Sequence, residues 1–320
     1  MDQDSIPSPE IASGSGYSIP YKLYLHCTAW VLRRSIAFLT GSGKLFDKTL
    51  TVPTPGLGEG YVNIALCIPH KNHDAHQGPW PLLLVAEGGG FILGQPSDGE
   101  HIDRFLGDKL YEVLKWALAP AAEEILGVSI DPARVAVMGN SAGGNLTASL
   151  SLLLSFTSGP CVAFRQGLPP NFRQVLQVLV YPSVDLSRGY DKRFGDSDKE
   201  TQASSLPCWA ATMMEASYLP PYIDKSQVFV SPLSAEIPLL KSLKPPSAIV
   251  VTAGKDCLKL EGRKYVENIR KAGVSVESRE YPEAIHGFSH YQEGSKDFRK
   301  EDVRDCWERI SKALERSFQD

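Results

Sequence analysis

A serine flanked by glycines stands near the middle of the chain, in the sequence Gly139-Asn-Ser-Ala-Gly143. The apolar run 135–138 before it predicts a short buried strand, and residues 145–155 after it have the pattern of a helix. A serine on so sharp a turn is held in strained backbone, and only residues without bulk let strand and helix approach each other. The pattern indicates that Ser141 is a nucleophile at a helix N-terminus, where developing negative charge is favoured. A glycine-rich turn with an idle serine is the alternative.

A nucleophilic serine needs a base, and histidine is the usual one near neutral pH. In this strand–turn–helix motif the acid and then the histidine follow the serine along the chain. His286 and His290 are the histidines after Ser141, and His286 comes just past the last predicted strand, beside a glycine that leaves its ring room to turn. Asp256 follows the preceding strand, where its carboxylate would fix the imidazole tautomer and stabilise the imidazolium. A hydrogen-bonded loop histidine and a surface aspartate are the alternatives.

Three consecutive glycines follow another apolar run, in Glu87-Gly-Gly-Gly90. Glycines bare their backbone N–H groups, and such groups stabilise the oxyanion of a tetrahedral intermediate. The N–H of Ala142, directly after the serine, would complete an oxyanion hole. A glycine triplet alone is equally typical of a flexible linker. The combination of four such features, each just past a predicted strand, favours an acyl-transfer site.

The elements that must position these residues alternate between strands and helices. Apolar runs predict strands over 48–52, 61–68, 81–86, 135–138, 175–181, 248–252 and 274–281, and apolar spacing predicts an amphipathic helix over 102–117. The alternation predicts an α/β fold, a mostly parallel sheet with helices on both faces. In such a sheet ligands bind beyond the carboxyl ends of the strands, so all four features would meet at one edge.

The chain is expected to hold a short N-terminal part and one catalytic domain. Residues 1–45 would supply a disordered N-terminus, over about 1–16, and cap helices within 21–39. Residues 46–320 would form the catalytic domain. Within it, 187–230 are polar and rich in turn residues, with a helix near 209–218. This stretch is too long for a plain crossover, so we expect it to be an insertion over the functional edge of the sheet.

Composition excludes several other classes of protein. The chain has 320 residues with 42% hydrophobic and 22% charged residues, as in ordinary globular proteins. A net charge of −4 without a basic block gives no indication of nucleic-acid binding. Six scattered cysteines indicate reduced thiols and a cytoplasmic location. Charges within 23–39 exclude a transmembrane segment there, and the acidic N-terminus is unlike a signal peptide.

We expect neither a cofactor nor a metal. The spacing His70-x-x-His73-x-x-His76 is like that of a metal cluster, but these residues lie in a polar loop whose one carboxylate is Asp74. We interpret the three histidines as a solvated loop.

The motifs around the candidate residues resemble those of the hormone-sensitive-lipase branch of the α/β-hydrolases. The motifs are Gly88-Gly-Gly-Phe91, Gly139-Asn-Ser-Ala-Gly-Gly144, Tyr181-Pro182, Ser231-Pro-Leu233, Gly254-Lys-Asp-Cys-Leu258 with Glu261-Gly262, and His286-Gly-Phe288. The resemblance covers about residues 45–320. It implies a carboxylesterase or lipase with a helical cap, to which residues 1–45 and 187–230 would contribute.

The resemblance also implies roles for individual residues. Ser141 would be the nucleophile, Asp256 the acid and His286 the base. The oxyanion donors would be Gly88, Gly89 and Ala142, and the residues that could line the substrate pocket are Glu87, Gly90, Phe91 and Asn140.

The chain departs from the family pattern at Glu87, where the family usually has histidine before the glycines. A carboxylate beside an oxyanion hole opposes the charge to be stabilised unless it is protonated, paired or turned away. Glu87 would either act on a substrate proton or simply buttress the loop.

A second departure lies between the glycine loop and the serine turn. The family has a further strand and a Tyr-Arg-Leu-Ala-Pro-Glu stretch there, whereas residues 91–135 contain helix and turn signals and no β-type run. We expect one interior strand to be missing near Leu110–Tyr111, either lost or removed with a skipped exon. Segment 61–68 must then pair directly with 81–86 or leave a sheet edge exposed. We expect lower stability and weaker activity than in the relatives.

These observations leave three functional hypotheses. The first is a serine esterase that cleaves small-molecule carboxylic esters through an acyl-enzyme. The second is a non-hydrolytic enzyme of specialised-metabolite biosynthesis, which performs cyclisation, dehydration or acyl transfer in the same pocket with help from Glu87. The third is a catalytically weak ligand-binding homologue, which the presence of His286 makes the least favoured.

Overall fold

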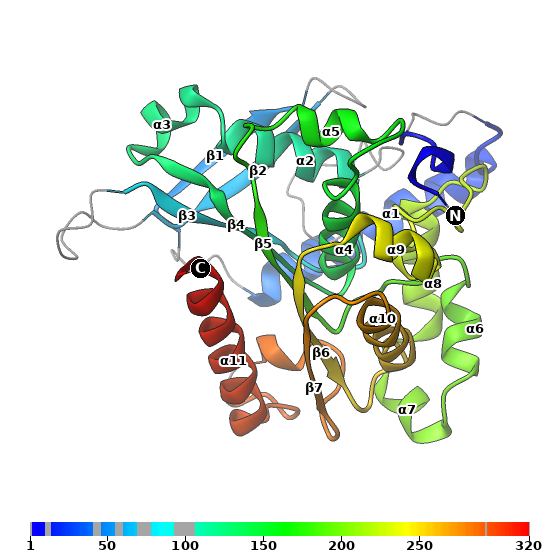
Figure 1. Cartoon of the computed structure of the whole chain (residues 1–320). Helices are drawn as coiled ribbons and strands as arrows, with labels where there is room; N and C mark the ends of the chain where they lie inside the picture. Colours follow the sequence, from blue (N-terminus) through cyan, green and yellow to red (C-terminus); the bar gives the residue numbers. More distant parts are fainter. Residues whose placement is uncertain are drawn as a thin grey trace.

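A computed structural model describes residues 2–9, 14–40, 46–54, 60–68, 78–92, 106–291 and 293–319. At its centre is a five-stranded sheet in which every neighbouring pair is parallel (Figure 1). Its strands, in spatial order, are β3 (Trp80–Ala86), β4 (Ile130–Asn140), β5 (Gln174–Val180), β6 (Ser247–Ala253) and β7 (Val276–Tyr281). The parallel sheet predicted from the alternating pattern is therefore confirmed.

The central strands are apolar because helices cover both of their faces. On β5, Leu179 points into a cluster with α4 (Ala142–Leu153), α9 (Ile237–Leu243) and α10 (Lys259–Lys271). Its neighbours Val178 and Val180 point the other way, into a cluster with α11 (Lys300–Gln319). Figure 1 shows the sheet between α11 and α10. A strand buried on both faces is mostly apolar, as β5 is, and its one fully buried polar side chain, Gln177, donates to the Pro246 carbonyl at 3.0 Å.

The remaining helices pack around one end and one face of the sheet. On the α4 side lie α2 (Leu106–Ala117) and α5 (Val162–Gln166), and α3 (Pro120–Leu126) leads into β4. The stretch expected to be an insertion folds into α6 (Tyr190–Gly195), α7 (Lys199–Ser204) and α8 (Cys208–Tyr218). Helix α1 (Ile19–Thr40) packs on α8, and Leu25, Ala29 and Met213 share a cluster with Ile92 just past the glycine loop. Short 3-10 turns, η2 (Pro232–Ser234) and η3 (Phe288–His290), follow the insertion and β7.

The N-terminal segment departs from our expectation of disorder. Residues Gln3–Ser5 form the 3-10 turn η1, and Ile6 is buried in the cluster beneath α9. The Gln3 side chain is 4% exposed; it donates to Ser242 Oγ at 2.8 Å and accepts the Thr157 N–H at 2.9 Å. A buried amide with both ends satisfied holds this segment against the domain.

The two strands before the sheet form a separate hairpin. β1 (Lys48–Pro53) and β2 (Tyr61–Leu66) are antiparallel partners, and within the described residues they make no ladder with the five-stranded sheet. β3 is consequently an edge strand, and its Leu83 and Val85 side chains are 38% and 43% exposed. Of the two arrangements expected for a missing strand, the structure has the one with an open edge.

The chain between β3 and β4 explains this open edge. In its described parts, 87–92 and 106–129, it contains helices and turns and no strand. Helix α2 continues through Leu110–Tyr111, the junction near which we expected an interior strand to be missing. The buried Tyr111 and Leu114 of this helix pack under β4 with Val135 and Val137.

Isosteric valine-to-threonine substitutions test whether the face of β3 that carries Leu83 and Val85 is open to solvent. Val85→Thr should change the free energy of unfolding by no more than about 0.5 kcal/mol, as for other exposed positions. Val137→Thr, at a fully buried position on neighbouring β4, should cost about 1–3 kcal/mol because a hydroxyl is buried there. Urea unfolding followed by circular dichroism measures both. A cost at Val85 equal to that at Val137 would show that this face of β3 is covered.

Candidate active site

The three residues selected from the sequence as nucleophile, base and acid lie in one hydrogen-bonded row. Ser141 stands between β4 and α4, His286 follows β7, and Asp256 follows β6. Ser141 Oγ is 2.9 Å from His286 Nε2, and His286 Nδ1 is 2.6 Å from Asp256 Oδ2. This geometry allows the imidazole to take the serine proton while the carboxylate fixes the ring tautomer.

The turn that carries Ser141 is possible because glycines flank it. A Cβ atom on Gly139 would lie 2.1 Å from the Gly143 carbonyl oxygen, and one on Gly143 would lie 1.9 Å from the Ala86 carbonyl oxygen. Ser141 itself has φ 53° and ψ −118°, a conformation that L-residues rarely adopt. Its N–H donates to the Val180 carbonyl at 2.9 Å, which ties the turn to β5. The surrounding backbone thus holds the strained serine in place.

The hydrogen-bonded row of Ser141, His286 and Asp256 is called the relay below. Burial and nearby charges set the pKa of its histidine. Asp256 is 1% exposed, and its Oδ1 accepts the Leu258 N–H at 3.1 Å while Oδ2 faces the histidine. Burial alone would lower the pKa of His286. The charge of Asp256, its hydrogen bond to the ring and the more distant charge of Glu261 outweigh burial and raise the pKa above its ordinary value. A raised pKa makes the imidazole a stronger base toward Ser141.

The glycine loop after β3 packs directly on the serine turn. A Cβ atom on Gly88 would lie 2.8 Å from the Asn140 carbonyl oxygen and 3.2 Å from Ser141 Cβ. The Gly88 N–H donates to Asn140 Oδ1 at 3.0 Å. Asn140, expected to line the pocket, therefore fastens the loop. Of the three expected oxyanion donors, Gly88 already has this partner, whereas Ala142 is the first residue of α4, where helix N–H groups have no intrahelical acceptor.

The Glu87 side chain is mostly exposed to solvent and lies beside His290. It is 65% exposed, and its Oε2 lies 3.9 Å from His290 Nε2. His290 Nδ1 is in turn 2.8 Å from the Tyr181 hydroxyl, and the Tyr181 ring centroid is 4.9 Å from that of His286. Glu87 thus lies toward His290 and solvent. A second polar row, from Glu87 through His290 to Tyr181, borders the relay.

Sequence reasoning gave Tyr181 and His290 no role. Tyr181 stands directly after the last residue of β5 and has φ 36°, a strained conformation at the carboxyl end of a strand. Its position at the carboxyl end of the predicted strand 175–181, the end at which the other site residues follow their strands, was the available signal.

Helix α8 of the insertion contacts the glycine loop from the other side. The Phe91 and Tyr218 rings stack with their centroids 4.0 Å apart. Gly90 has φ 59°, a conformation that favours glycine, and a Cβ atom there would lie 2.3 Å from Met214 Sδ. The residues expected to line the pocket, Gly90 and Phe91, are therefore held by the insertion.

Other site predictions fall outside this arrangement. His70, His73 and His76 lie outside the described residues. Among the residues that are described, no group of three or more histidine, cysteine, aspartate or glutamate side chains could hold a metal ion. No helix in the described ranges is long and apolar enough to cross a membrane.

Comparison with known proteins places the chain in a family. A family model of the alpha/beta hydrolase fold matches residues 106–290, more than half of the chain. The chain belongs to this alpha/beta hydrolase family, which confirms the resemblance read from its motifs.

Relatives that are similar in sequence agree with this assignment. Carboxylesterase NlhH of Mycobacterium tuberculosis is 29% identical over 188 residues, which cover 58% of this chain and 51% of that protein. Carboxylic ester hydrolase LipN of the same species is 29% identical over 237 residues, which cover 66% and 58%. Bovine arylacetamide deacetylase is 26% identical over 231 residues, which cover 56% and 54%. The chain thus spans little more than half the length of these relatives.

Solved structures show the same fold. A thermostable esterase from Pseudomonas putida superposes with a TM-score of 0.66 at 22% identity, over 96% of this chain and 97% of that one. A bacterial heroin esterase superposes with a TM-score of 0.64 at 22% identity, over 98% and 94%.

The charge of Asp256 makes a testable prediction about pH. Asp256→Asn should reduce kcat/KM for an ester by about 10³–10⁴-fold. It should also move the acid limb of the pH profile to lower pH. The carboxylate raises the pKa of His286, and a protonated ring cannot accept the serine proton, so loss of the negative charge lowers the pH at which activity falls.

The pH dependence of kcat/KM measures this shift, because it reports the free enzyme. Asp131→Asn is the matched control, since that carboxylate pairs with Arg134 at the opposite end of β4. An acid limb that stays in place or moves to higher pH in Asp256→Asn would contradict the role of Asp256.

Proposed function

We propose that the chain is a serine hydrolase that cleaves carboxylic esters of small molecules through an acyl-enzyme. The observation that carries the proposal is the row from Ser141 through His286 to Asp256, with bonds of 2.9 and 2.6 Å beside a glycine loop. The names of the relatives, carboxylesterase and carboxylic ester hydrolase, support the same chemistry.

The reaction follows from the positions of these groups. His286 Nε2 takes the Ser141 hydroxyl proton as Oγ bonds to the ester carbonyl carbon. The carbonyl oxygen becomes an oxyanion, which the N–H groups of Gly89 and Ala142 would bind. His286 returns the proton to the leaving alcohol, and the acyl group remains on Ser141. Water, deprotonated by the same imidazole, then attacks the acyl carbon; the bond to Ser141 Oγ breaks, the imidazolium returns the proton to Oγ, and the acid is released.

The position of Ala142 strengthens oxyanion binding. It is the first residue of α4, whose 12 residues run away from the site. The helix N-terminus carries partial positive charge, so its dipole and its free N–H groups both favour the tetrahedral intermediate.

The structure offers no support for a reaction that uses Glu87. A carboxylate that abstracts a substrate proton must lie within hydrogen-bond reach of it. The Glu87 side chain instead lies toward His290 and is 65% exposed. We therefore favour ester hydrolysis over the non-hydrolytic alternative. The hydrogen bonds of His286 to Ser141 and Asp256 favour catalysis over ligand binding alone.

Alanine variants of the relay test the proposal. Ser141→Ala and His286→Ala should each reduce kcat for a p-nitrophenyl ester by about 10⁴-fold or more, and the double variant should be little worse, because the residues act as a unit. His290→Ala is the matched control, since it removes a neighbouring histidine outside the relay. Independent, multiplying losses in the double variant, or full turnover by Ser141→Ala, would refute the assignment.

Acyl-chain preference makes a separate prediction. The stacked Phe91 and Tyr218 rings and the Met214 side chain crowd the glycine loop on the insertion side. We expect short and medium acyl esters to be hydrolysed faster than long-chain triglycerides. A panel of p-nitrophenyl esters of increasing acyl length, with an emulsified triglyceride, measures the preference. Fastest turnover of the emulsion would contradict it.

A further inference from the structure

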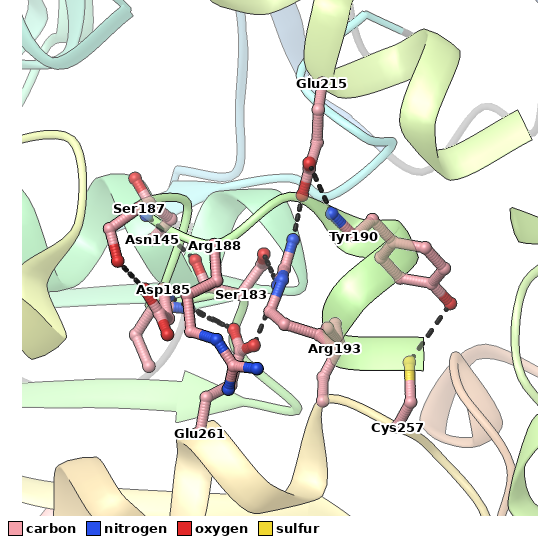
Figure 2. A network of polar contacts seen from close by, with 12 residues as sticks. Asn145, Ser183, Asp185, Ser187, Arg188, Tyr190, Arg193, Glu215, Cys257 and Glu261 are labelled. Atoms are coloured by element: carbon pink, nitrogen blue, oxygen red, sulfur yellow. Dashed lines mark hydrogen bonds and ion pairs between the residues drawn. The ribbon is translucent and has the colours of Figure 1, made fainter. Parts of the chain in front are cut away.

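A buried guanidinium group joins the insertion to the loops behind the active site. Arg193, on α6, lies between Glu215 and Glu261 (Figure 2). Its side chain is 4% exposed. One guanidinium nitrogen donates to Glu261 Oε2 at 2.7 Å and lies 3.3 Å from Ser183 Oγ. The other donates to Glu215 Oε1. The two carboxylates come from different helices, Glu215 from α8 and Glu261 from α10, so a single planar fork connects three helices.

The Glu261 arm reaches the nucleophile turn. Glu261 Oε1 accepts the N–H groups of Val184 and Asp185, at 2.7 and 3.2 Å, in the loop after β5. In the same loop the Ser183 N–H donates to the Ser141 carbonyl at 3.1 Å. The buried Asn145 amide also donates to the Ser183 carbonyl at 2.8 Å. The carboxylate held by Arg193 therefore fixes the loop on which the backbone of the nucleophile rests.

The Glu215 arm reaches the oxyanion side. Glu215 Oε2 accepts the Tyr190 N–H at 3.0 Å, which closes α8 onto the start of α6. Its neighbour on the helix, Met214, packs against Gly90, and Tyr218, one turn further on, stacks on Phe91. A shift of α8 relative to α6 would therefore move the glycine loop.

Burying the Arg193 network costs desolvation free energy, which limits how much the network can stabilise the fold. One guanidinium faces two carboxylates, and burial raises the pKa of Glu261 while the charge of Arg193 opposes the rise. Buried ion pairs are often no more stable than apolar residues of the same size, so stability alone is a weak reason for such a cluster. The planar guanidinium does hold its N–H groups in fixed directions toward two acceptors, and a lysine ammonium cannot reproduce this geometry.

We propose that Arg193 is a positioning residue that sets the glycine loop and the Ser141 turn at a fixed distance from each other. This inference rests on the proposed esterase function. The guanidinium acts through Glu215 and α8 on one side of the substrate carbonyl and through Glu261 and the loop after β5 on the other. Because a misplacement of about 1 Å can cost about 100-fold in rate, loss of the fork should reduce kcat more than it changes KM.

Two arginine variants test the fork. Arg193→Lys should lower kcat by about 10–100-fold with KM changed less than about threefold, because one ammonium cannot hold both carboxylates in the same geometry. Arg193→Ala should lose more, and guanidinium chloride at tens of millimolar should restore part of its kcat. Methylammonium chloride at equal ionic strength should not, since it lacks the fork. All rates are taken per active site, by titration with a fluorophosphonate.

The control variant is Arg188→Ala, which removes an arginine that pairs with Asp196 on the same insertion but is half exposed. It should keep the parental kcat. If Arg193→Ala does not fold, Glu215→Gln cuts only the α8 arm and should show the same fall in kcat with little change in KM.

The outcomes separate this inference from the proposed function. An unchanged kcat per titrated site in Arg193→Lys and Glu215→Gln, with a lower melting temperature alone, would overturn the positioning role, as would equal rescue by both cations. Ester turnover that does not depend on Ser141 would instead refute the proposed function. In that case the rate at which the fluorophosphonate labels Ser141 still tests the fork, and an unchanged labelling rate in the variants would overturn it.

Discussion

The contact on which the site depends is the close approach of two backbones, at Gly143 and at the carbonyl of Ala86. No side chain fits between them, since a Cβ atom on Gly143 would lie 1.9 Å from that oxygen. The register of β3 on β4 sets this contact, because Ala86 is the partner of Gly139. The carboxyl ends of the two strands therefore finish level, and the glycine loop and the serine turn emerge side by side. The hairpin of β1 and β2 contributes no residue to the relay, so its separation from the sheet leaves the relay intact.

Two buried charged groups, Asp256 and Arg193, stand on either side of this contact, and different partners stabilise the charge of each. Asp256 is satisfied by a histidine and a backbone N–H, and its charge tunes the pKa of His286. Arg193 faces two carboxylates through its two terminal nitrogens, while its buried Nε has no hydrogen-bond partner within the described residues, and its charge serves to fix the geometry of the helices. Each system pays for desolvation with specific hydrogen bonds, as buried charges must. The two systems meet where α10 begins, since Asp256 precedes that helix and Glu261 lies in its first turn.

The sheet and the relay could be predicted because they depend on local patterns. Strands buried on both faces read as apolar runs, and each relay residue stands just after such a run. The parts that could not be predicted depend on partners far apart in sequence. Gln3 has the appearance of a disordered terminus until its amide meets Thr157, and Arg193 has the appearance of a solvated charge in a polar insertion until Glu215 and Glu261 surround it. The bond between the Gly88 N–H and the Asn140 side-chain oxygen is another such contact, because nothing in the local sequence indicates it.

The open edge of β3 and the Arg193 network are connected through the glycine loop. A strand with ladders on both sides is fixed by its neighbours, whereas β3 has one described neighbour, β4, and its side chains on one face are partly exposed. The loop that follows β3 therefore receives less support from the sheet and relies more on what packs on its far side. That side is α8, which the buried guanidinium fixes through Glu215. A fold that lacks support at one edge of its active site thus depends on the insertion, and the ion network supplies the rigidity that the sheet does not.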